Sequence, residues 1–530
     1  MVVESPWPTL APYPKAFAPL WLEGAALRHG DKAAFVDREG KTCSFRQAVT
    51  LARRIGRFLQ EEGIAKGDRV AVISSNYLTL IPAYLGALWA GGVAYPMSPL
   101  YKGRELRYFL ADSGARAVLA VESAVAGVEE VRADLPDLQG LYSLEELEER
   151  VRDVPPEPLP VAIDPDKDLA ALFYTGGTTG IPKGAPLTHA NVLAAVRQYV
   201  PARSHNSYDV FLCFAPYYHA FSMLGLGFFG LYNGATQVVM PRFDPQESLA
   251  LTERYRATHI LTNPTGLMNL TEAAQKGPYD LSSLVLIAIG NAPLPVEVWR
   301  RGQEVLGCAV ASTYGSTETS GLTINIPWRF KAGSVGPLFP DTQARFLDLE
   351  ADEDVPPGGT GEIAVRGPQV FGGYWQRPDA NAEAFTADGF FRTGDVGRAD
   401  EDGYIYIVDR KKAIIKYKGY QVPAAELEAL LLEHPAIQEV VVIPKPVLEV
   451  GEIPKALVVL RPEAQASPEE LKKELMAFVE ARVAPYKKVR EVEFVQAIPR
   501  SPAGKVLRQE LMDRERAIPP GGSPGPGRAG

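Results

Sequence analysis

Short apolar runs alternate with longer helical segments over the first two thirds of the chain. Runs rich in Val, Ile, Leu and Ala, such as DRVAVISSN, ARAVLAV, THILTN and SLVLIAIGN, have the length and composition of buried strands. Helical segments separate these runs between about residues 20 and 350. Alternation of this kind predicts α/β layers built on parallel sheets.

The pattern changes after the segment PPGGTGEIAVRGP. Alternating segments such as DGYIYIVD predict antiparallel strands and a β-barrel-like part. Beyond the charged cluster DRKK at 409–412, PAAELEALLLEH and SPEELKKELMAFVEARV predict helices, and EVVVIPKP and KALVVL predict strands. Ser467, with Glu470 three residues later, predicts the cap of the second helix. We expect a large domain over 1–409, a small mobile α+β domain over 410–516 and a disordered tail over 517–530.

Two long stretches carry no Asp, Glu, Lys or Arg, one between Arg69 and Lys102 and one between Asp209 and Arg242. Length alone would admit a membrane span. Each stretch divides into a predicted strand, helix and strand, which predicts a buried parallel sheet and no transmembrane segment. The second stretch contains GLGFFG at 225–230, a formal dinucleotide fingerprint. It sits inside a predicted helix and not directly after a strand, so close helix packing is favoured over nicotinamide or flavin binding.

Composition narrows the class of protein. The 530 residues are 46% hydrophobic and 22% charged, which is typical of a globular chain of two or more domains. A formal charge of −9 gives no general attraction to nucleic acid. The N-terminus has no apolar core of a secretory signal, and three scattered cysteines predict neither a disulfide framework nor a zinc cluster. We therefore predict a cytoplasmic protein.

The stretch YTGGTTGIPKG at 174–184 crowds glycines and threonines ahead of Lys183. Backbone N–H groups, hydroxyls and one positive charge together form a nest for phosphate, although a flexible turn is the simpler alternative. The spacing differs from the Walker pattern because Lys183 follows Pro182 and no hydroxyl comes after it. An ordinary P-loop nucleotidase is disfavoured.

Eight motifs in order along the chain carry a resemblance. They are YTGGTTGIPKG at 174–184, APYYHAF at 215–221, GNAPLP at 290–295, YGSTE at 314–318, GEIAVRGP at 361–368, FFRTGD at 390–395, VDRKKAIIKYKGYQV at 408–422 and IPRSPAGK at 498–505. The series resembles the signatures of the adenylate-forming enzymes, the superfamily of acyl-CoA synthetases, aryl-CoA ligases and luciferases. The resemblance implies that a carboxylic acid reacts with ATP to give acyl-AMP and pyrophosphate, and that coenzyme A then displaces AMP. Mg²⁺ would assist the first step.

The resemblance also implies a role for each matching residue. The phosphates of ATP would lie against Thr175, Gly176, Gly177, Thr178, Thr179, Gly180 and Lys183. Adenine would lie between Tyr314, with Gly315 beside it, and the backbone of Gly290, Asn291 and Ala292. The ribose would bind Asp395 and Arg410, Mg²⁺ would bind Glu318, and the α-phosphate would contact Thr317. Lys505 would donate to the acyl carboxylate during adenylation, and His219 would lie beside that carboxylate. Lys412 would be the hinge of the small domain, which brings Lys416 and Gly419 to the site for the thiol step.

The acid itself is the open question. The segment APYYHAFSMLGLGFF supplies no aspartate to meet an amino acid's ammonium group, so an apolar acid is predicted. Phe221, Gly225 and Leu322 are expected to line its tunnel. We predict a medium- or long-chain fatty acid, because Gly176 stands where many members carry serine, as in bacterial long-chain fatty acyl ligases. A 4-coumarate-like acid is the alternative, and a non-catalytic ATP-binding protein is the alternative of another class. A homodimer and a peripheral membrane contact are left open.

Overall fold

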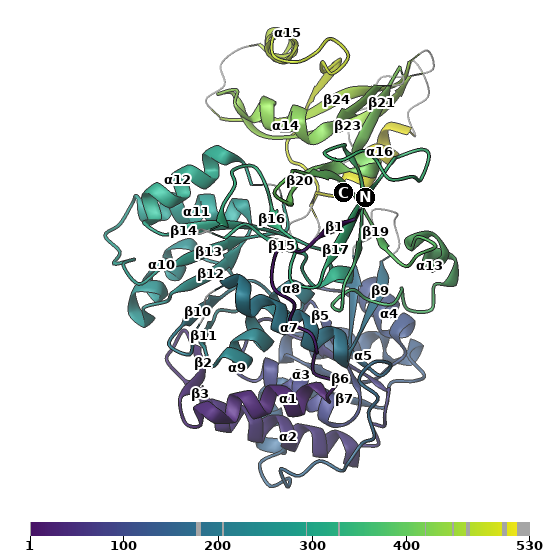
Figure 1. The fold of residues 1–530 in the computed structure, drawn as a ribbon. Helices are drawn as coiled ribbons and strands as arrows, with labels where there is room; N and C mark the ends of the chain where they lie inside the picture. The colour runs from purple at the N-terminus through teal and green to yellow at the C-terminus, as the bar shows by residue number, and fades with distance from the viewer. Residues whose placement is uncertain are drawn as a thin grey trace.

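The computed structural model describes residues 2–175, 182–203, 206–292, 294–326, 329–418, 420–447, 450–462, 467–500 and 506–516. These residues form four sheets, three of them ending by Arg410 and the fourth beginning at Ile414 (Figure 1). Helices cover the first two sheets, the third is a curled antiparallel sheet, and the fourth belongs to a separate C-terminal part. The predicted fold class is confirmed.

The first sheet is parallel except at one edge, where β8 and β9 form an antiparallel pair around the glycine-rich loop. Its strand order is β7 (Gly140–Ser143), β6 (Ala115–Ala120), β4 (Arg69–Ile73), β5 (Val93–Met97), β8 (Leu169–Thr175) and β9 (Lys183–Thr188). The two flanks of the loop are therefore fixed by strand pairing.

The second sheet has a parallel centre with a short antiparallel strand at each edge. Its order is β15 (Thr323–Ile324), β14 (Ala309–Tyr314), β13 (Leu286–Ile289), β12 (His259–Thr262), β10 (Val210–Cys213), β11 (Thr236–Val239), β2 (Ala33–Asp37) and β3 (Thr42–Ser44). The carboxyl ends of β13 and β14 are neighbours, so the loops that follow them open at the same edge.

Helices connect these strands. They are α1 (Ala18–Ala26), α2 (Phe45–Glu61), α3 (Leu80–Trp89), α4 (Gly103–Ser113), α5 (Glu122–Val131), α6 (Leu144–Arg150), α7 (His189–Arg203), α8 (Ala220–Ser222), α9 (Phe229–Asn233), α10 (Pro245–Tyr255), α11 (Pro264–Ala274) and α12 (Val296–Leu306). Side-chain caps fix several starts: Ser44 forms a capping box with Gln47, and Asp244 and Asn263 each cap a helix that begins with proline.

The uncharged stretch after Arg69 forms part of the core. Every residue of α3 from Leu80 to Leu88 is buried. Its Gly86 packs against Ile55 of α2, and Gly56 packs against Trp89, so closely that a Cβ on either glycine would lie within 2.5 Å of its neighbour. Among the described helices, none combines the length and the apolar character needed to cross a membrane.

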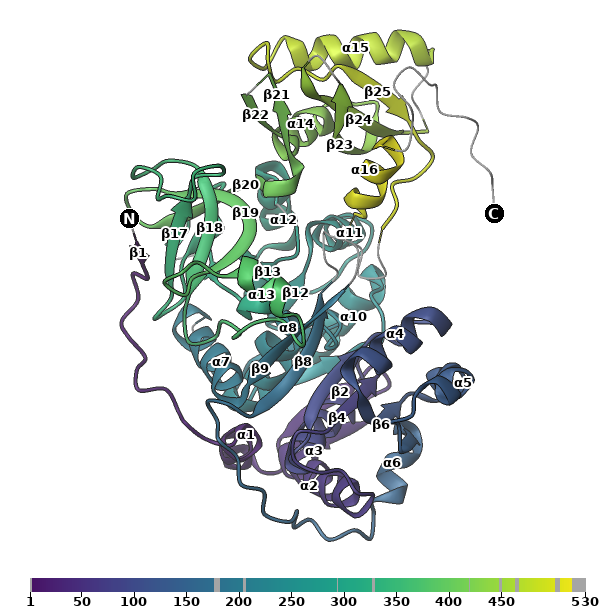
Figure 2. The same cartoon turned by 90° about the vertical axis from the view of Figure 1, so that its right-hand side faces the viewer.

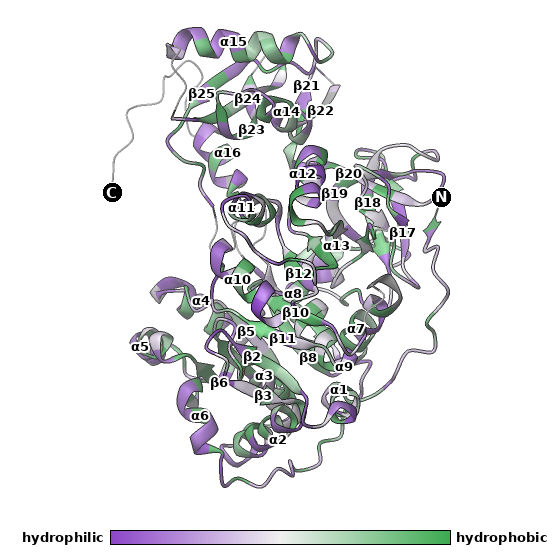
Figure 3. Ribbon diagram, turned by 90° about the vertical axis from the view of Figure 1, so that its left-hand side faces the viewer, coloured by the Kyte–Doolittle hydropathy of each residue, from purple (hydrophilic) through white to green (hydrophobic). Residues whose placement is uncertain are grey.

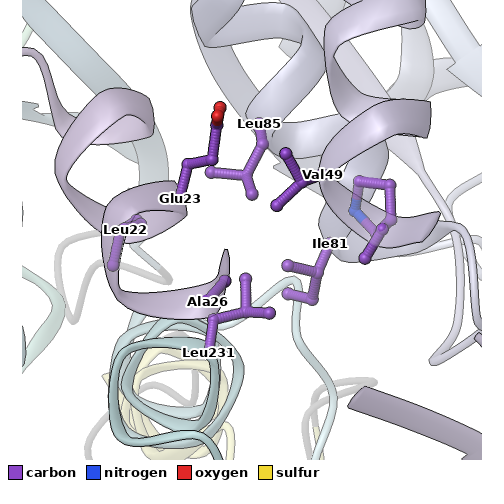
Figure 4. A pocket seen from close by; sticks show the side chains of 9 residues that line it. Leu22, Glu23, Ala26, Val49, Ile81, Leu85 and Leu231 are labelled. Carbon is purple, nitrogen blue, oxygen red and sulfur yellow. The ribbon is translucent and has the colours of Figure 1, made fainter. Parts of the chain in front are cut away.

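A small apolar pocket lies between α1, α2, α3 and α9 (Figure 4). Val49, Ile81 and Leu231 point into it, and Leu22 is among the residues that line it. The carboxylate of Glu23 is buried at its rim and binds Arg53, with Oε1 2.5 Å from one terminal guanidinium nitrogen and Oε2 3.0 Å from Nε. Because that charge is paired, we attribute the pocket to imperfect packing between the helices.

The second uncharged stretch contains a π-helix, η3 (Met223–Phe228), between α8 and α9. The sequence predicts an ordinary helix here, whereas the structure has the wider turn of a π-helix. All three glycines of GLGFFG pack against side chains: Gly225 against Tyr199, Gly227 against Ile81 and Gly230 against Gln237. Close packing is thus the structural use of these glycines.

The third sheet is antiparallel and runs β1 (Val3–Glu4), β17 (Gln343–Leu347), β18 (Gly361–Arg366), β19 (Phe391–Ala399), β20 (Tyr404–Arg410) and β16 (Gly336–Pro337). The helix α13 (Pro378–Ala384) precedes β19. The pairing of β19 with β20 sets Asp395 directly opposite Arg410.

The C-terminal part stands above the rest of the molecule in Figure 2. Its sheet contains β22 (Tyr420–Pro423), β21 (Ile414–Tyr417), β24 (Gly451–Leu460), β23 (Ile437–Val447) and β25 (Glu491–Phe494), and its helices are α14 (Ala424–Leu432), α15 (Pro468–Glu480) and α16 (Arg508–Arg516). Ser467 caps α15 by accepting from the Glu470 amide, as predicted. Figure 3 shows that green, apolar strands form the interior of the sheets, with purple segments on the outer helices.

Candidate active site

The glycine-rich loop begins and ends on paired strand residues. Thr175 ends β8, Lys183 begins β9, and their Cα atoms are partners in the pair. The Thr175 hydroxyl donates to the Lys183 carbonyl oxygen at 3.5 Å. The loop itself falls outside the described residues, and so do the predicted phosphate-binding residues Gly176, Gly177, Thr178, Thr179 and Gly180.

A segment that the sequence analysis did not single out holds both flanks of this loop. The Trp375 amide donates to the Gly184 carbonyl at 2.8 Å, and its indole donates to the Asp112 carbonyl at 3.3 Å. The Asp112 carboxylate accepts from the Tyr174 hydroxyl at 2.6 Å and binds the guanidinium of Arg377. The ends of β8 and β9 that flank the loop are therefore bonded to Asp112 and Trp375.

Glu318 is connected to Lys183 through one aromatic ring. It lies in the short 3₁₀ helix η4 (Thr317–Thr319), directly after Thr317, and is 8% exposed. The hydroxyl of Tyr374 donates to Glu318 Oε1 at 3.0 Å, and Lys183 Nζ lies 4.8 Å from the centroid of the Tyr374 ring. Burial, with Glu318 beside it, raises the pKa of Tyr374, so this hydroxyl stays a donor.

Asp395 joins the third sheet to the end of β14. Its Oδ2 accepts from the Tyr314 hydroxyl at 2.6 Å, and its Oδ1 lies 2.7 Å from Arg410 Nε. The carboxylate is buried. Burial, followed by the charge of Asp395, raises the pKa of Tyr314 well above its usual value. The predicted nucleotide residues Tyr314, Asp395 and Arg410 are thus in direct contact.

The loops after β13 and β14 lie at one edge of the second sheet, as their pairing requires. Gly290 packs so closely on Phe221 and Thr313 that a Cβ there would lie 3.0 Å from the phenyl ring. Asn291 and Ala292 are exposed, and so is Gly315, which follows Tyr314. These backbone segments leave an accessible surface beside Tyr314.

The residues predicted to bind the acid lie behind the edge of the second sheet at which the loops after β13 and β14 open. His219 precedes α8 and its ring packs on Tyr218 at 4.6 Å between centroids. Leu322 is buried, and its amide donates to the Tyr314 carbonyl at 2.9 Å. Gly225 faces Tyr199, as described above. Of the predicted acyl residues, Phe221 and Leu322 therefore contact the predicted nucleotide residues Gly290 and Tyr314.

The C-terminal residues are placed only in part. Lys412 is exposed in the turn η6 (Lys411–Ala413), which joins β20 to β21. Lys416 Nζ lies 2.6 Å from Glu350 Oε1, on the surface of the large part. The predicted site residues Gly419 and Lys505 lie outside the described residues.

Sequence reasoning missed Tyr374 and Tyr199. The first stands in FGGYW at 371–375, which begins three positions after the last residue of the GEIAVRGP motif, and an aromatic residue there was a usable signal. Tyr199 follows Arg197 and Gln198 in α7, and nothing in the local pattern marks it.

The fold and this constellation define an adenylate-forming enzyme. The chain belongs to the AMP-binding enzyme family, which it matches over residues 22–375, and residues 426–505 match the AMP-binding enzyme C-terminal domain. It is an ATP-dependent acid–CoA ligase that uses coenzyme A as co-substrate.

Known relatives differ in the acid that their names specify. A long-chain-fatty-acid–CoA ligase of Bacillus subtilis is 34% identical over 97% of this chain and 99% of its own. A 4-coumarate–CoA ligase of Pinus taeda is 34% identical over 91% and 92%. Among solved structures, ATP-bound MatB from Rhodopseudomonas palustris matches with a TM-score of 0.85 at 30% identity, over 93% of this chain and 99% of that one. The anthranilate–CoA ligase AuaEII with anthranoyl-AMP matches with 0.86 at 26% identity, over 96% and 98%.

Proposed function

We propose that this enzyme converts an apolar carboxylic acid to its acyl-CoA thioester through acyl-AMP. The observation that supports the proposal is the continuity of two clusters: Tyr314, Asp395 and Arg410 on one side, and Glu318, Tyr374 and Lys183 on the other. Both converge where β14 ends. A ligand that bridges them would need a nucleoside at one end and phosphates at the other, as ATP has.

In the adenylation step, a carboxylate oxygen of the acid attacks the α-phosphorus and pyrophosphate leaves. Lys183 neutralises charge on the leaving phosphates, and the loop between Thr175 and Lys183 supplies backbone donors. We assign the ribose hydroxyls to Asp395, because its buried carboxylate lies beside Tyr314 and Arg410 at the end of β14, and a carboxylate accepts hydrogen bonds from a diol. The exposed backbone of Asn291 and Ala292 faces adenine opposite Tyr314.

The chemistry of Glu318 fits a magnesium ion. Its buried carboxylate accepts one hydrogen bond from Tyr374, and within the described residues no lysine or arginine forms an ion pair with it. A hard cation prefers such an oxygen ligand. When bound, Mg²⁺ supplies positive charge to the phosphates. Tyr374 would orient the carboxylate for that role.

The residues that we expect to surround the acid favour an apolar tail. The six residues of η3 are apolar or glycine and are all buried. A fatty acid of medium or long chain is our first candidate, supported by the Bacillus relative. A compact aryl acid is the second, because the names of the Pinus relative and of AuaEII specify aryl acids.

The test is acid-dependent exchange of pyrophosphate into ATP. Butyrate, octanoate, laurate, palmitate and 4-coumarate are supplied in turn, and coenzyme A is added afterwards to follow thioester formation. We expect exchange with at least one of these acids and none with glycine or alanine. Exchange with the amino acids alone would overturn the apolar-acid proposal, and ATP binding without exchange for any acid would favour the non-catalytic alternative.

A further inference from the structure

Tyr199 lies behind the predicted acyl site, in α7. Its side chain is completely buried, and its hydroxyl donates to the Ser320 carbonyl at 3.2 Å. Its ring packs edge-on against Phe339 at 5.1 Å between centroids and is tilted against Phe229 at 5.9 Å. These contacts hold the ring in one position.

Two glycines face the phenol end of this side chain from opposite segments. A Cβ at Gly225, in η3, would lie 3.2 Å from Tyr199 Cζ and 3.3 Å from the hydroxyl oxygen. A Cβ at Gly321, after η4, would lie 2.7 Å from the same oxygen. Gly321 also has φ of +102°, which side chains rarely adopt. The phenol therefore fills the space between the π-helix and the loop at 320–322.

That space adjoins the predicted nucleotide residues. Gly315 packs against Gly321, and Leu322 donates its amide to the Tyr314 carbonyl at 2.9 Å. The loop at 320–322 thus lies between the Tyr199 hydroxyl and Tyr314. π-Helical turns concentrate at functional sites, and η3 forms the facing wall.

We infer that Tyr199 closes the far end of the acyl pocket and limits the length of the acid. The inference rests on the proposed function and narrows it: the acid has a medium-length or single-ring tail, and a long chain does not fit. A long tail would have to displace a ring that Phe229, Phe339 and Ser320 hold in place. Simple core packing is the competing explanation for the same contacts.

The experiment compares the acid profiles of the wild type and Tyr199→Ala by pyrophosphate exchange. In the wild type we expect octanoate or 4-coumarate to exceed palmitate. In Tyr199→Ala the ratio of kcat/KM for palmitate to that for octanoate should rise about tenfold or more, since each added methylene that finds space contributes to binding. Tyr199→Phe keeps the ring and should keep the wild-type profile.

Phe45→Ala is the matched control for loss of a buried ring, because Phe45 is equally buried but lies at the start of α2. It should lower the thermal midpoint without changing the profile. A folded Tyr199→Ala variant with an unchanged profile would overturn the inference.

A measurement on the wild type covers the case in which Tyr199→Ala does not fold. Non-hydrolysable acyl-sulfamoyl adenosines with octanoyl and palmitoyl tails are compared by calorimetry, and we expect the octanoyl compound to bind at least about tenfold more tightly. Equal or tighter binding of the palmitoyl compound would refute the length limit and leave the proposed function standing. If no acid of the panel supports exchange, the proposed function fails and the length limit fails with it.

Discussion

The hydroxyl of Tyr374 reaches the carboxylate that we assign to magnesium, 3.0 Å from Glu318 Oε1. Removing it in Tyr374→Phe keeps the ring under Lys183 and deletes only the donor. A hydrogen bond to a charged group contributes about 1.5 kcal/mol or more, so the Mg²⁺ concentration for half-maximal exchange should rise about tenfold. The measurement is a Mg²⁺ titration of exchange, joined to Mn²⁺ binding by magnetic resonance in the presence of ATP.

Tyr142→Phe is the matched control. Its hydroxyl also donates to a glutamate, Glu62 Oε2 at 2.7 Å, but it lies on β7, among residues that we place outside the site. The control should leave the Mg²⁺ dependence unchanged. An unchanged titration in Tyr374→Phe would remove the tyrosine from the positioning of Glu318.

The role of a single residue could be predicted where a sequence motif identifies it. It could not be predicted where the role depends on a tertiary contact. Tyr314, Asp395 and Arg410 were assigned together by resemblance, and the structure places them in contact. Tyr199 could not be assigned, because its importance comes from Gly225 and Gly321, which reach it only through the packing of α7 against η3. A helix pattern shows which face is buried, but not what that face meets.

Among the elements, α7 and α1 are joined by a buried histidine. His189 begins α7, and its Nδ1 accepts from the Ala18 amide at 3.3 Å. Burial lowers the pKa of His189 from 6.5 to about 4, with Lys66 acting in the same direction and Asp168 opposing. A histidine that is neutral when folded and protonates more readily when unfolded stabilises the fold fully above pH 6.5. That stability is lost as the pH falls from 6.5 towards 4.

We therefore expect acidification from pH 7 to pH 5 to remove about 2 kcal/mol of stability through this group. His189→Asn retains an acceptor and has no such titration. Its thermal midpoint should lie below that of the wild type at pH 7, and the difference should shrink or reverse at pH 5. A gap between the two midpoints that stays constant with pH would contradict the assignment.

The elements themselves were largely predictable, and the exception has a physical reason. Strands such as β4, β12 and β13 follow from continuous apolar runs, and α15 follows from Ser467 and the pattern after it. The sequence predicts an ordinary helix for the π-helix η3, because all of its residues are apolar or glycine. The segment has no polar face whose spacing would indicate the number of residues per turn. Gly225 and Gly227 in this turn pack tightly against Tyr199 and Ile81, which are contacts that the local sequence does not show.

At the scale of the molecule, two polar bonds between described residues of the C-terminal part and the rest lie near the predicted hinge. Lys416 pairs with Glu350, and the Ala425 amide donates to Asp409 Oδ2 at 2.9 Å. Both members of the first pair are more than half exposed, so the pair contributes little, about 0 to 1 kcal/mol. This pair would therefore oppose a movement of the C-terminal part only weakly.

We propose that the C-terminal part moves between the two half-reactions, with Lys412 as the hinge. Adenylation needs Lys505 at the site, whereas the thiol step needs the segment that contains Lys416 and Gly419. Lys505→Ala should slow pyrophosphate exchange about a hundredfold, as expected for a lost donor in the transition state, and still convert supplied acyl-AMP to acyl-CoA. Gly419→Leu should do the reverse.

Lys412→Pro distinguishes a moving hinge from a fixed linker. Proline restricts the torsions of η6, so thioester formation should slow more than exchange, while Lys412→Ala, which leaves the backbone free, should keep the wild-type ratio of the two rates. Both half-reactions are measured separately, one by exchange and the other from supplied acyl-AMP. Equal loss of both rates in Lys412→Pro, Lys505→Ala and Gly419→Leu would mean that one arrangement of the domains serves both steps.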